Sequence, residues 1–270
     1  MNPRSHKFRR PKAHHYVVRH DLSLQLDNAA HLPVTAILAP PGYGKTTFIS
    51  NYIESKTQNV IWYNVDDGDA DLASFFHYHG LAVKSATPQR RKQIPHFQPI
   101  NYINIKMFTR DYFASIYTRL DNAFYLVFDD FHECTSPQWA EIIRIAIDEL
   151  PENCRVFLVG RHALSAEFSR LKLNQKIHFI HENDLRFSDQ ELAKLARTYR
   201  SEKISEQQIQ QIQHMMTGWA AGLTLLFSRD SLPMEKTLFN MDTEQDLFEY
   251  FSSEILRSVS DAVRNVLNSG

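Results

Sequence analysis

Hydrophobic residues occur along this chain in short continuous runs that alternate with longer amphipathic stretches. The five apolar runs span residues 34–39, 59–65, 124–128, 155–159 and 176–180. The stretches with helical periodicity cover residues 48–54, 71–83, 111–120 and 137–150. Unbroken apolar runs are typical of strands buried on both faces, and helices between them supply the crossovers of a parallel sheet. We therefore predict an α/β fold with a parallel, doubly wound sheet.

The pattern changes after residue 183, where apolar runs give way to signals for helix starts. Ser188 with Glu191, and Ser205 with Gln208, both have the spacing of a capping box. Gly218 predicts the end of the second of these helices, and a third is expected over residues 219–227. A small helical subdomain is therefore predicted to follow the sheet. Residues 229–233 are a candidate linker to two further amphipathic stretches, 244–256 and 261–267.

One segment, residues 84–107, interrupts the alternation of runs and helices. It contains Pro88, Pro95, Pro99 and the basic cluster Arg90-Arg-Lys92. We predict a solvated surface loop here, with a role in interactions as the alternative.

Composition narrows the class of protein. With 270 residues, of which 43% are hydrophobic, the chain can bury a substantial core, and it lacks the ~20-residue apolar stretch of a membrane span. The basic start is followed by no apolar segment, so a secretory signal is not predicted and a cytoplasmic location is expected. Two cysteines, Cys134 and Cys154, are expected to be reduced. The net charge of −1 argues against a surface that neutralises many DNA phosphates.

The chemistry is clearest directly after the first apolar run, where the chain has the sequence Ala-Pro-Pro-Gly-Tyr-Gly-Lys-Thr-Thr. Gly42 and Gly44 let the backbone point several N–H groups at one anion, and a helix start adds its positive dipole end. Lys45 is expected to reach the β- and γ-phosphates of a nucleotide, and Thr46 to place its hydroxyl on Mg²⁺. Ala39 stands where the strict pattern has its first glycine. The predicted phosphate-binding residues are Pro41, Gly42, Tyr43, Gly44, Lys45, Thr46 and Thr47.

Two carboxylates, Asp129 and Asp130, follow the apolar run 124–128. Because parallel strands end at one edge of a sheet, they are expected beside the phosphate loop. Asp129 would hold Mg²⁺ through water, and Asp130 would orient or deprotonate the attacking water. Arg161, at the end of the next run, is expected to contact the γ-phosphate. The rival interpretations are an acidic turn and a plain surface arginine.

Together these motifs resemble the ATPase module of the MalT-type regulators, which are LuxR-family transcription activators in the STAND class of signalling NTPases. The resemblance extends over nearly the whole chain. Besides the phosphate loop and Arg161, it is carried by Lys7-Phe-Arg-Arg-Pro11, Val18-Arg19-x-x-Leu22, Trp62-Tyr-Asn-Val-Asp-Asp-Gly-Asp69, Phe128-Asp-Asp-Phe-His132, Leu185-Arg-Phe-Ser188 and Gly218-Trp-Ala-Ala-Gly-Leu223.

The resemblance implies a P-loop NTPase of the ASCE/AAA-like type, with ATP or ADP and Mg²⁺ as cofactors and with Val18 and Arg19 on the adenine side. It also implies a switch in which ADP holds a closed monomer, while ATP and an inducer open it for self-association or pairing with a longer regulator. Ala220 departs from the family, because many relatives have a base-contacting proline there. The sensor and DNA-binding domains of the family do not follow in this sequence, so no direct DNA binding by this chain is expected.

We accordingly divide the chain into a nucleotide-binding domain, residues 1–184, a helical lid, residues 185–230, and a linker leading toward a winged-helix domain, residues 231–270. The residues alone leave two other functions open. A small-molecule phosphotransferase uses the same phosphate loop, and a binding module retains nucleotide without turnover.

Overall fold

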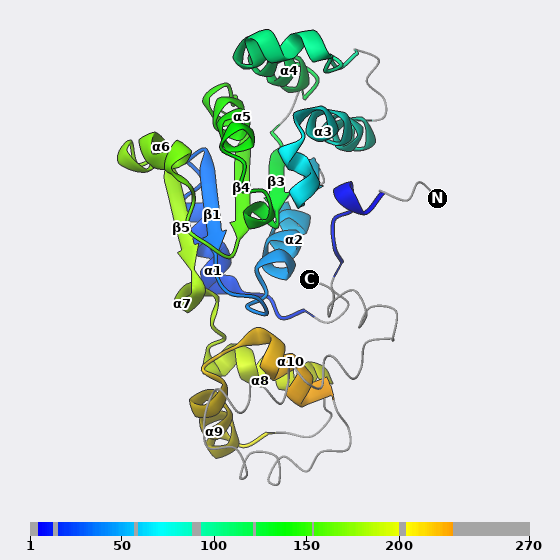
Figure 1. Cartoon of the computed structure of the whole chain (residues 1–270). Coiled ribbons are helices and arrows are strands. Elements are labelled where there is room, and N and C mark those ends of the chain that lie inside the picture. The colour runs from blue at the N-terminus through cyan, green and yellow to red at the C-terminus, as the bar shows by residue number, and fades with distance from the viewer. Residues whose placement is uncertain are drawn as a thin grey trace. The chain divides into compact units, whose positions relative to one another are not determined.

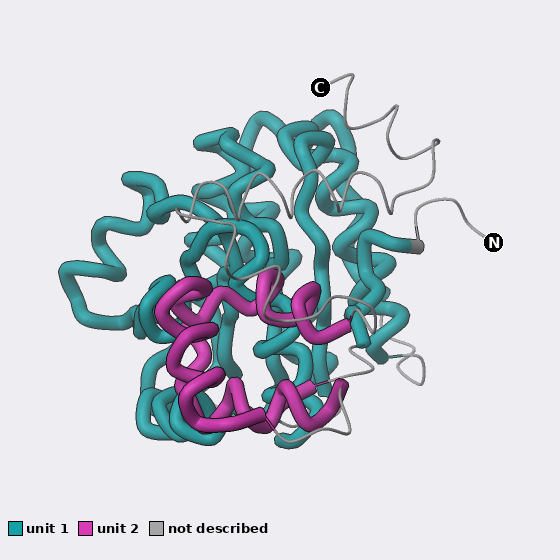
Figure 2. Tube along the Cα trace, turned by 90° about the horizontal axis from the view of Figure 1, so that it is seen from below, with its two compact units in different colours: residues 1–14, 19–185 teal, residues 15–18, 186–270 magenta. Residues whose placement is uncertain are grey.

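The computed structural model describes residues 5–12, 16–56, 59–87, 93–120, 123–152, 154–199 and 204–228 (Figure 1). They belong to two compact units, residues 1–14 with 19–185 and residues 15–18 with 186–270 (Figure 2). The linker candidate, the stretches predicted over residues 244–256 and 261–267, the winged-helix approach and the basic cluster at residues 90–92 lie outside the described residues.

The strands are β1 Val34–Leu38, β2 Val60–Asn64, β3 Tyr125–Asp129, β4 Arg155–Gly160 and β5 Ile177–His181. The α-helices of the first unit are α1 His20–Asn28, α2 Lys45–Lys56, α3 Leu72–Ala86, α4 Ile105–Tyr117, α5 Pro137–Asp148, α6 Ser169–Leu173 and α7 Glu182–Leu185. Those of the second are α8 Asp189–Tyr199, α9 Glu206–Met216 and α10 Ala220–Ser228. Short 3₁₀ turns are η1 Ser5–Phe8, η2 Asp67–Ala70, η3 Pro99–Asn104, η4 Phe131–Glu133 and η5 Ala166–Phe168.

All five strands pair in parallel, in the order β2-β3-β4-β1-β5. The predicted parallel sheet is therefore confirmed. Consecutive strands β1 and β2 are not neighbours, because β4 and β3 lie between them (Figure 1). The chain leaves β1 toward one edge of the sheet and returns to the other side of β1 as β5. In open α/β sheets, ligands bind at the carboxyl ends of the strands where the strand order reverses in this way.

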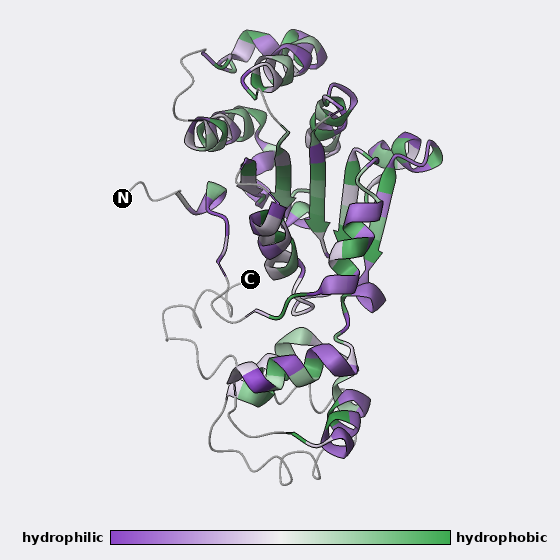
Figure 3. Ribbon diagram, turned by 180° about the vertical axis from the view of Figure 1, so that it is seen from behind, coloured by the Kyte–Doolittle hydropathy of each residue, from purple (hydrophilic) through white to green (hydrophobic). Residues whose placement is uncertain are grey.

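Helices cover both faces of this sheet because its strands are apolar on both sides (Figure 3). On β1, Val34 and Ala36 belong to the core shared with α3, α4 and α5, whereas Ile37 belongs to the core shared with α1 and α2. The same alternation places Leu126 on the first face and Val127 on the second. Two separate cores thus hold β1, β3 and β4 in fixed register.

Helix α1 lies in a segment for which no element was predicted; its Leu22 and Leu26, four residues apart, are buried, while Leu24 is exposed. One prediction for the first unit was wrong. Helix α4 begins six residues before the predicted position, since the Asn104 side chain accepts a hydrogen bond from the Met107 N–H and caps it.

The segment predicted as a solvated loop over residues 84–107 is only partly one. Its first residues belong to α3 and its last to α4. Between them Ile94 is buried, and the Phe97 ring stacks on Phe76 of α3, with 5.2 Å between ring centroids. The two rings hold the segment against α3.

The second unit is built from α8, α9 and α10 around its own core. Its two helix-start signals are confirmed: Ser205 N–H donates to Gln208 Oε1, and Ser188 N–H donates to Glu191 Oε2. Residues 15–18, predicted to belong to the nucleotide-binding domain, group instead with this unit, where Val17 is buried.

Two motifs of the resemblance meet inside the second unit. The Phe187 N–H donates to the Gly218 carbonyl at 3.0 Å, and Gly218 has a positive φ of 75°. A Cβ at Gly218 would lie 2.6 Å from the Phe187 nitrogen, so glycine is required on both grounds.

Within the described part of the chain, no helix has the length and apolar character needed to cross a bilayer. Cys134 and Cys154 are free and buried.

The N-terminal segment is attached to the sheet through a buried charge cluster. Lys7 Nζ lies 2.8 Å from Asp69 Oδ1 and 2.7 Å from Asp66 Oδ1, and the Tyr63 hydroxyl donates to Asp69 Oδ1 at 2.6 Å. Lys7 and Asp69 are almost completely buried. Removing Asp69 therefore leaves the buried Lys7 charge only partly compensated, by the more exposed Asp66.

We expect Asp69→Ala to lower the free energy of unfolding by about 3 kcal/mol, because the buried Lys7 ammonium would keep only the part-exposed Asp66 as a partner and the Tyr63 hydroxyl would lose its acceptor. Urea denaturation measures this. The matched control is Lys56→Ala, which removes a half-exposed pair with Asp27 and should cost less than about 1 kcal/mol. Equal losses in the two variants would contradict a structural role for the buried cluster.

Candidate phosphate-binding site

The loop between β1 and α2 has the backbone of an anion cradle. Gly42 and Gly44 adopt φ angles of 81° and 75°, in the left-handed region that favours glycine. Helix α2 begins at Lys45, so the N–H groups of its first turn have no partner within the helix and face the loop end. The Tyr43 hydroxyl donates to Glu182 Oε1 at 2.9 Å and ties the loop to the residue after β5. Unpaired N–H groups at a helix start form a site for an anion.

Lys45 is held inside this loop. Its ammonium donates to the carbonyls of Ala39 and Pro40, at 2.7 and 2.9 Å. Burial lowers the Lys45 pKa, the nearby Arg161 guanidinium lowers it further, and the charges of Asp130 and Asp129 oppose both effects. Two cations and two carboxylates therefore interact within one small region.

The phosphate loop and the acid pair are joined by one hydrogen bond. Thr46 Oγ1 donates to Asp129 Oδ1 at 2.9 Å, and the same oxygen accepts from the Asp130 N–H at 3.1 Å. Asp129 is 2% exposed. Burial raises its pKa to about 6, the charge of Asp130 adds to this, and the Thr46 hydrogen bond acts in the opposite direction.

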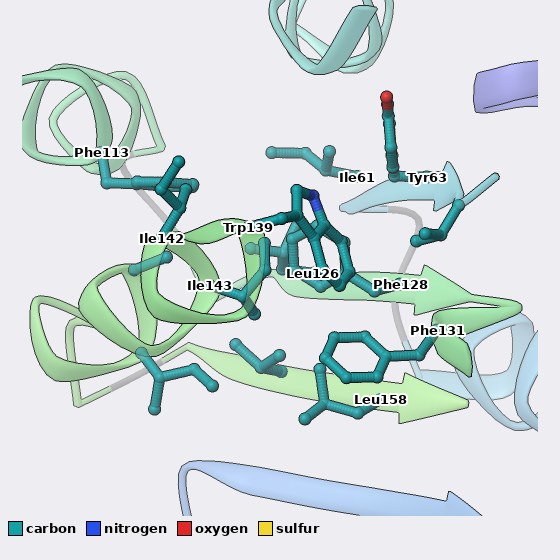
Figure 4. Close-up of a cluster of buried hydrophobic side chains, with 14 of the residues drawn as sticks. Ile61, Tyr63, Phe113, Leu126, Phe128, Phe131, Trp139, Ile142, Ile143 and Leu158 are labelled. Atoms are coloured by element: carbon teal, nitrogen blue, oxygen red, sulfur yellow. The ribbon is translucent and has the colours of Figure 1, made fainter. Parts of the chain in front are cut away.

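The acid pair is positioned by the aromatic residues on either side of it. Phe128 and Phe131 both pack against Trp139 of α5, with ring centroids 6.3 and 4.9 Å apart (Figure 4). The chain returns to the core between them because Asp130 turns it, with a left-handed φ of 54°. Aspartate tolerates this conformation better than most residues. The turn leaves Asp129 buried and Asp130 exposed.

Arg161 follows β4, and β4 lies between β1 and β3. Gly160 is the register partner of Leu38, and its carbonyl accepts from the Ala39 N–H at 3.2 Å. Arg161 is exposed and sits between the start of the phosphate loop and the end of β3. Strand order therefore places it between Lys45 and the acid pair.

The structure places the other predicted site residues as follows. Pro41 and Thr47 are exposed on the same loop and helix start. Arg19 is 4% exposed and donates to the Leu185 carbonyl at 2.9 Å within the first unit. Val18 is half-exposed and belongs to the second unit. Lys45, Thr46, Asp129, Asp130 and Arg161 are the predicted residues that the fold brings to one edge of the sheet.

Several features at this edge were not predicted. The Ala39 and Pro40 carbonyls and the Tyr43–Glu182 contact are among them, although the position of Glu182 directly after a strand was a usable signal. His132 is another. Its side chain is 9% exposed, and its Nε2 lies 3.0 Å from Glu133 Oε1 without the alignment of a hydrogen bond. Burial lowers the His132 pKa, and Arg161 lowers it further.

No known protein-family profile matches the chain. Among solved structures, the chain is similar to a Signal Transduction ATPase with Numerous Domains (STAND) protein with a tetratricopeptide repeat sensor from Pyrococcus horikoshii, at a TM-score of 0.52 and 18% identity. That match covers 87% of this chain and 34% of the other. A Walker-type ATPase of Pyrococcus abyssi matches at a TM-score of 0.56 and 11% identity, over 94% of this chain and 77% of the other.

These similarities establish a P-loop ATPase fold. The chain spans about a third of the STAND protein. At such identities the likeness extends to the arrangement of helices and strands, and function has to be argued from the site itself.

We expect Asp129→Asn to stabilise the protein at pH 7.5 by on the order of 2 kcal/mol, because the folded pKa of Asp129 is about 6 and its ordinary value is 3.8. Asparagine keeps an oxygen that accepts from Thr46. Between pH 3.8 and about 6, the Asp129 carboxyl is protonated in the folded wild type and ionised in the unfolded chain. The free energy of unfolding of the wild type therefore falls as pH rises through this range. The advantage of the variant should thus vanish near pH 4. Urea titrations at several pH values measure it, and an advantage independent of pH would contradict the raised pKa of Asp129 as its cause.

Proposed function

We propose that this chain binds a Mg²⁺–adenine nucleotide at the carboxyl edge of its sheet and hydrolyses ATP slowly as a signalling switch. The observation that carries the proposal is the 2.9 Å contact between Thr46 Oγ1 and Asp129 Oδ1. It joins the phosphate loop to a buried carboxylate. The Thr46 hydroxyl and the Asp129 carboxylate both supply the oxygen ligands that Mg²⁺ prefers.

The residues take separate roles in this proposal. The loop N–H groups hold the phosphates, and Lys45 exchanges its two carbonyl partners for β- and γ-phosphate oxygens. Thr46 and Asp129 hold the metal, the latter through water. Mg²⁺, when bound, offsets the negative charge of the phosphate oxygens. Asp130, exposed next to the buried Asp129, orients or deprotonates the attacking water.

Arg161 takes the role of γ-phosphate sensor. A guanidinium placed by β4 between the loop and the acid pair interacts with the terminal phosphate more than with the other two. Turnover in a switch is expected to be well below the ~10 s⁻¹ of typical enzymes, because the protein has to dwell in each bound state.

The finer part of the proposal rests on the resemblance to MalT-type regulators. It comprises transcription regulation in the cytoplasm, a contribution of Val18 and Arg19 to adenine binding, and self-association or pairing with a longer regulator in the ATP state. The STAND protein with a tetratricopeptide repeat sensor adds support at the level of fold.

Lys45→Ala is expected to weaken ATP binding at least about a hundredfold, because the loop loses its buried cation beside the phosphates. Titration with a fluorescent ATP analogue measures the affinity. Lys56→Ala, at the other end of α2, is the matched control and should bind like the wild type. An unchanged affinity for ATP in Lys45→Ala would contradict nucleotide binding at this site.

Arg161→Ala should reduce the preference for ATP over ADP, with the loss confined to ATP, because the guanidinium interacts chiefly with the γ-phosphate. The ratio of the two dissociation constants is the quantity to measure. Arg170→Ala, on α6, is the control and should leave that ratio unchanged. A ratio equal to that of the wild type would assign Arg161 to the solvated surface.

Testing ATP turnover with and without candidate acceptor molecules separates the switch from a phosphotransferase.

A further inference from the structure

The side chain of His132 carries two polar atoms that the fold buries without a partner. It is 9% exposed, and within the described part of the chain neither of its ring nitrogens has a hydrogen bond. A buried polar group without a hydrogen bond costs stability, so native proteins keep few of them, and each needs an explanation. Because His132 lies two residues after Asp130, the proposed nucleotide site offers one.

The 3₁₀ turn η4 holds His132 at the end of β4. Phe131, the first residue of this turn, points into the core and fixes its backbone (Figure 4). The turn packs closely on Gly160, where a Cβ would lie 3.6 Å from the backbone nitrogen of His132. The His132 ring also meets the edge of the His162 ring, with 5.8 Å between centroids. The residues before and after Arg161 therefore both lie beside His132.

The charge of Arg161 acts on the phosphate loop and on His132. Burial lowers the pKa of Lys45 and that of His132, and in both cases the Arg161 guanidinium lowers it further. Arg161 itself is exposed. Fixing one rotamer of an exposed arginine costs entropy, so a phosphate sensor at this position benefits from a neighbour that holds its guanidinium.

The Glu133 carboxylate indicates which ring nitrogen of His132 carries the proton. His132 Nε2 lies 3.0 Å from Glu133 Oε1. An unprotonated Nε2 would direct its lone pair at this oxygen, so the proton belongs on Nε2. Burial and the Arg161 charge lower the His132 pKa against the opposing charges of Glu133 and Asp130, which keeps the ring neutral near pH 7.5. Among the described residues, Nδ1 is then a buried acceptor without a donor.

We propose that His132 is a positioning residue, whose Nδ1 atom accepts a hydrogen bond from Arg161 and so aims the guanidinium at the γ-phosphate of bound ATP. A guanidinium has five N–H groups, so it can bond to the ring and still present two of them to phosphate oxygens. Hydrogen bonds of this kind often become well aligned only in the complex with the ligand. The inference rests on the proposed nucleotide site and adds to it the residue that holds the sensor.

Two other roles for His132 predict different behaviour. A ring that only fills space in the core could be replaced by phenylalanine without an effect on nucleotide binding. A ring that acts as the base for the attacking water, in place of Asp130, would change hydrolysis and leave the affinities for ATP and ADP as they are. Binding and turnover measured on the same variants therefore separate these roles from positioning.

His132→Phe, made in the full chain, keeps a flat ring and removes both nitrogens. Because these nitrogens are buried without partners, the substitution should not lower the thermal unfolding temperature of the nucleotide-free protein. It should reduce the preference for ATP over ADP about tenfold, since Arg161 loses the acceptor that holds it. Titrations with fluorescent ATP and ADP analogues give both dissociation constants. His132→Asn places an amide oxygen near the position of Nδ1 and should keep the preference within about threefold of the wild type.

His178→Phe is the matched control. The His178 ring also has a buried nitrogen without a hydrogen bond among the described residues, but it lies on β5. This variant should keep the wild-type preference for ATP. Arg161→Ala and the double variant with His132→Phe complete a double-mutant cycle, in which His132→Phe should cause no further loss once Arg161 is removed.

A second measurement does not depend on nucleotide. Nitrogen NMR of the full chain with isotope-labelled histidine distinguishes the two neutral forms of the ring, and the signal missing from His132→Asn identifies His132. We expect the proton on Nε2, because the Glu133 carboxylate faces that atom.

Four results would overturn the inference. One is a wild-type preference for ATP in His132→Phe when Arg161→Ala has lost it, and another is an additive loss in the double variant. The third is a proton on Nδ1. The fourth is a loss of hydrolysis in His132→Phe with both affinities unchanged, which would assign the ring to the attacking water. A wild-type preference in Arg161→Ala itself would instead contradict the sensor role in the proposed function, and this inference with it.

Discussion

The candidate site depends on the hydrogen bond between Thr46 and Asp129, which joins the end of β3 to the start of α2 at 2.9 Å. This bond requires β1, β4 and β3 to end at one edge in fixed register, which the two cores on either side of the sheet provide. It also requires a carboxylate to be buried, although burial raises the pKa of Asp129 to about 6. The protein therefore keeps a group at this position that costs stability near neutral pH, as is common at functional sites.

Much of this arrangement could be predicted from residues that are close in sequence. The strands are unbroken apolar runs, the phosphate loop has its glycines where φ is positive, and the capping boxes mark the starts of α8 and α9. The strand order was not predicted, because no local pattern indicates that β4 lies between β1 and β3. The position of Arg161 relative to Lys45 depends on that long-range pairing.

The errors have physical causes of the same kind. No element was predicted over the segment of helix α1, whose leucines lie at every second position; packing against the sheet buries Leu22 and Leu26. The prolines before α4 suggested a solvated loop, but the Phe97 ring stacks on Phe76 and holds the segment against α3. The carbonyl partners of Lys45 arise from tertiary folding and leave no pattern in the sequence, whereas Glu182, which accepts from Tyr43, was indicated only by its position directly after a strand.

We propose that the phosphate loop and the acid pair of this chain form one nucleotide-binding site. Native mass spectrometry of the purified, undenatured protein tests it most directly, since a tightly held nucleotide survives purification and can be identified by its mass. We expect one adenine nucleotide per chain, with ADP dominant and Mg²⁺ retained with it. Protein that is free of nucleotide and takes up none from millimolar Mg²⁺–ATP would contradict it.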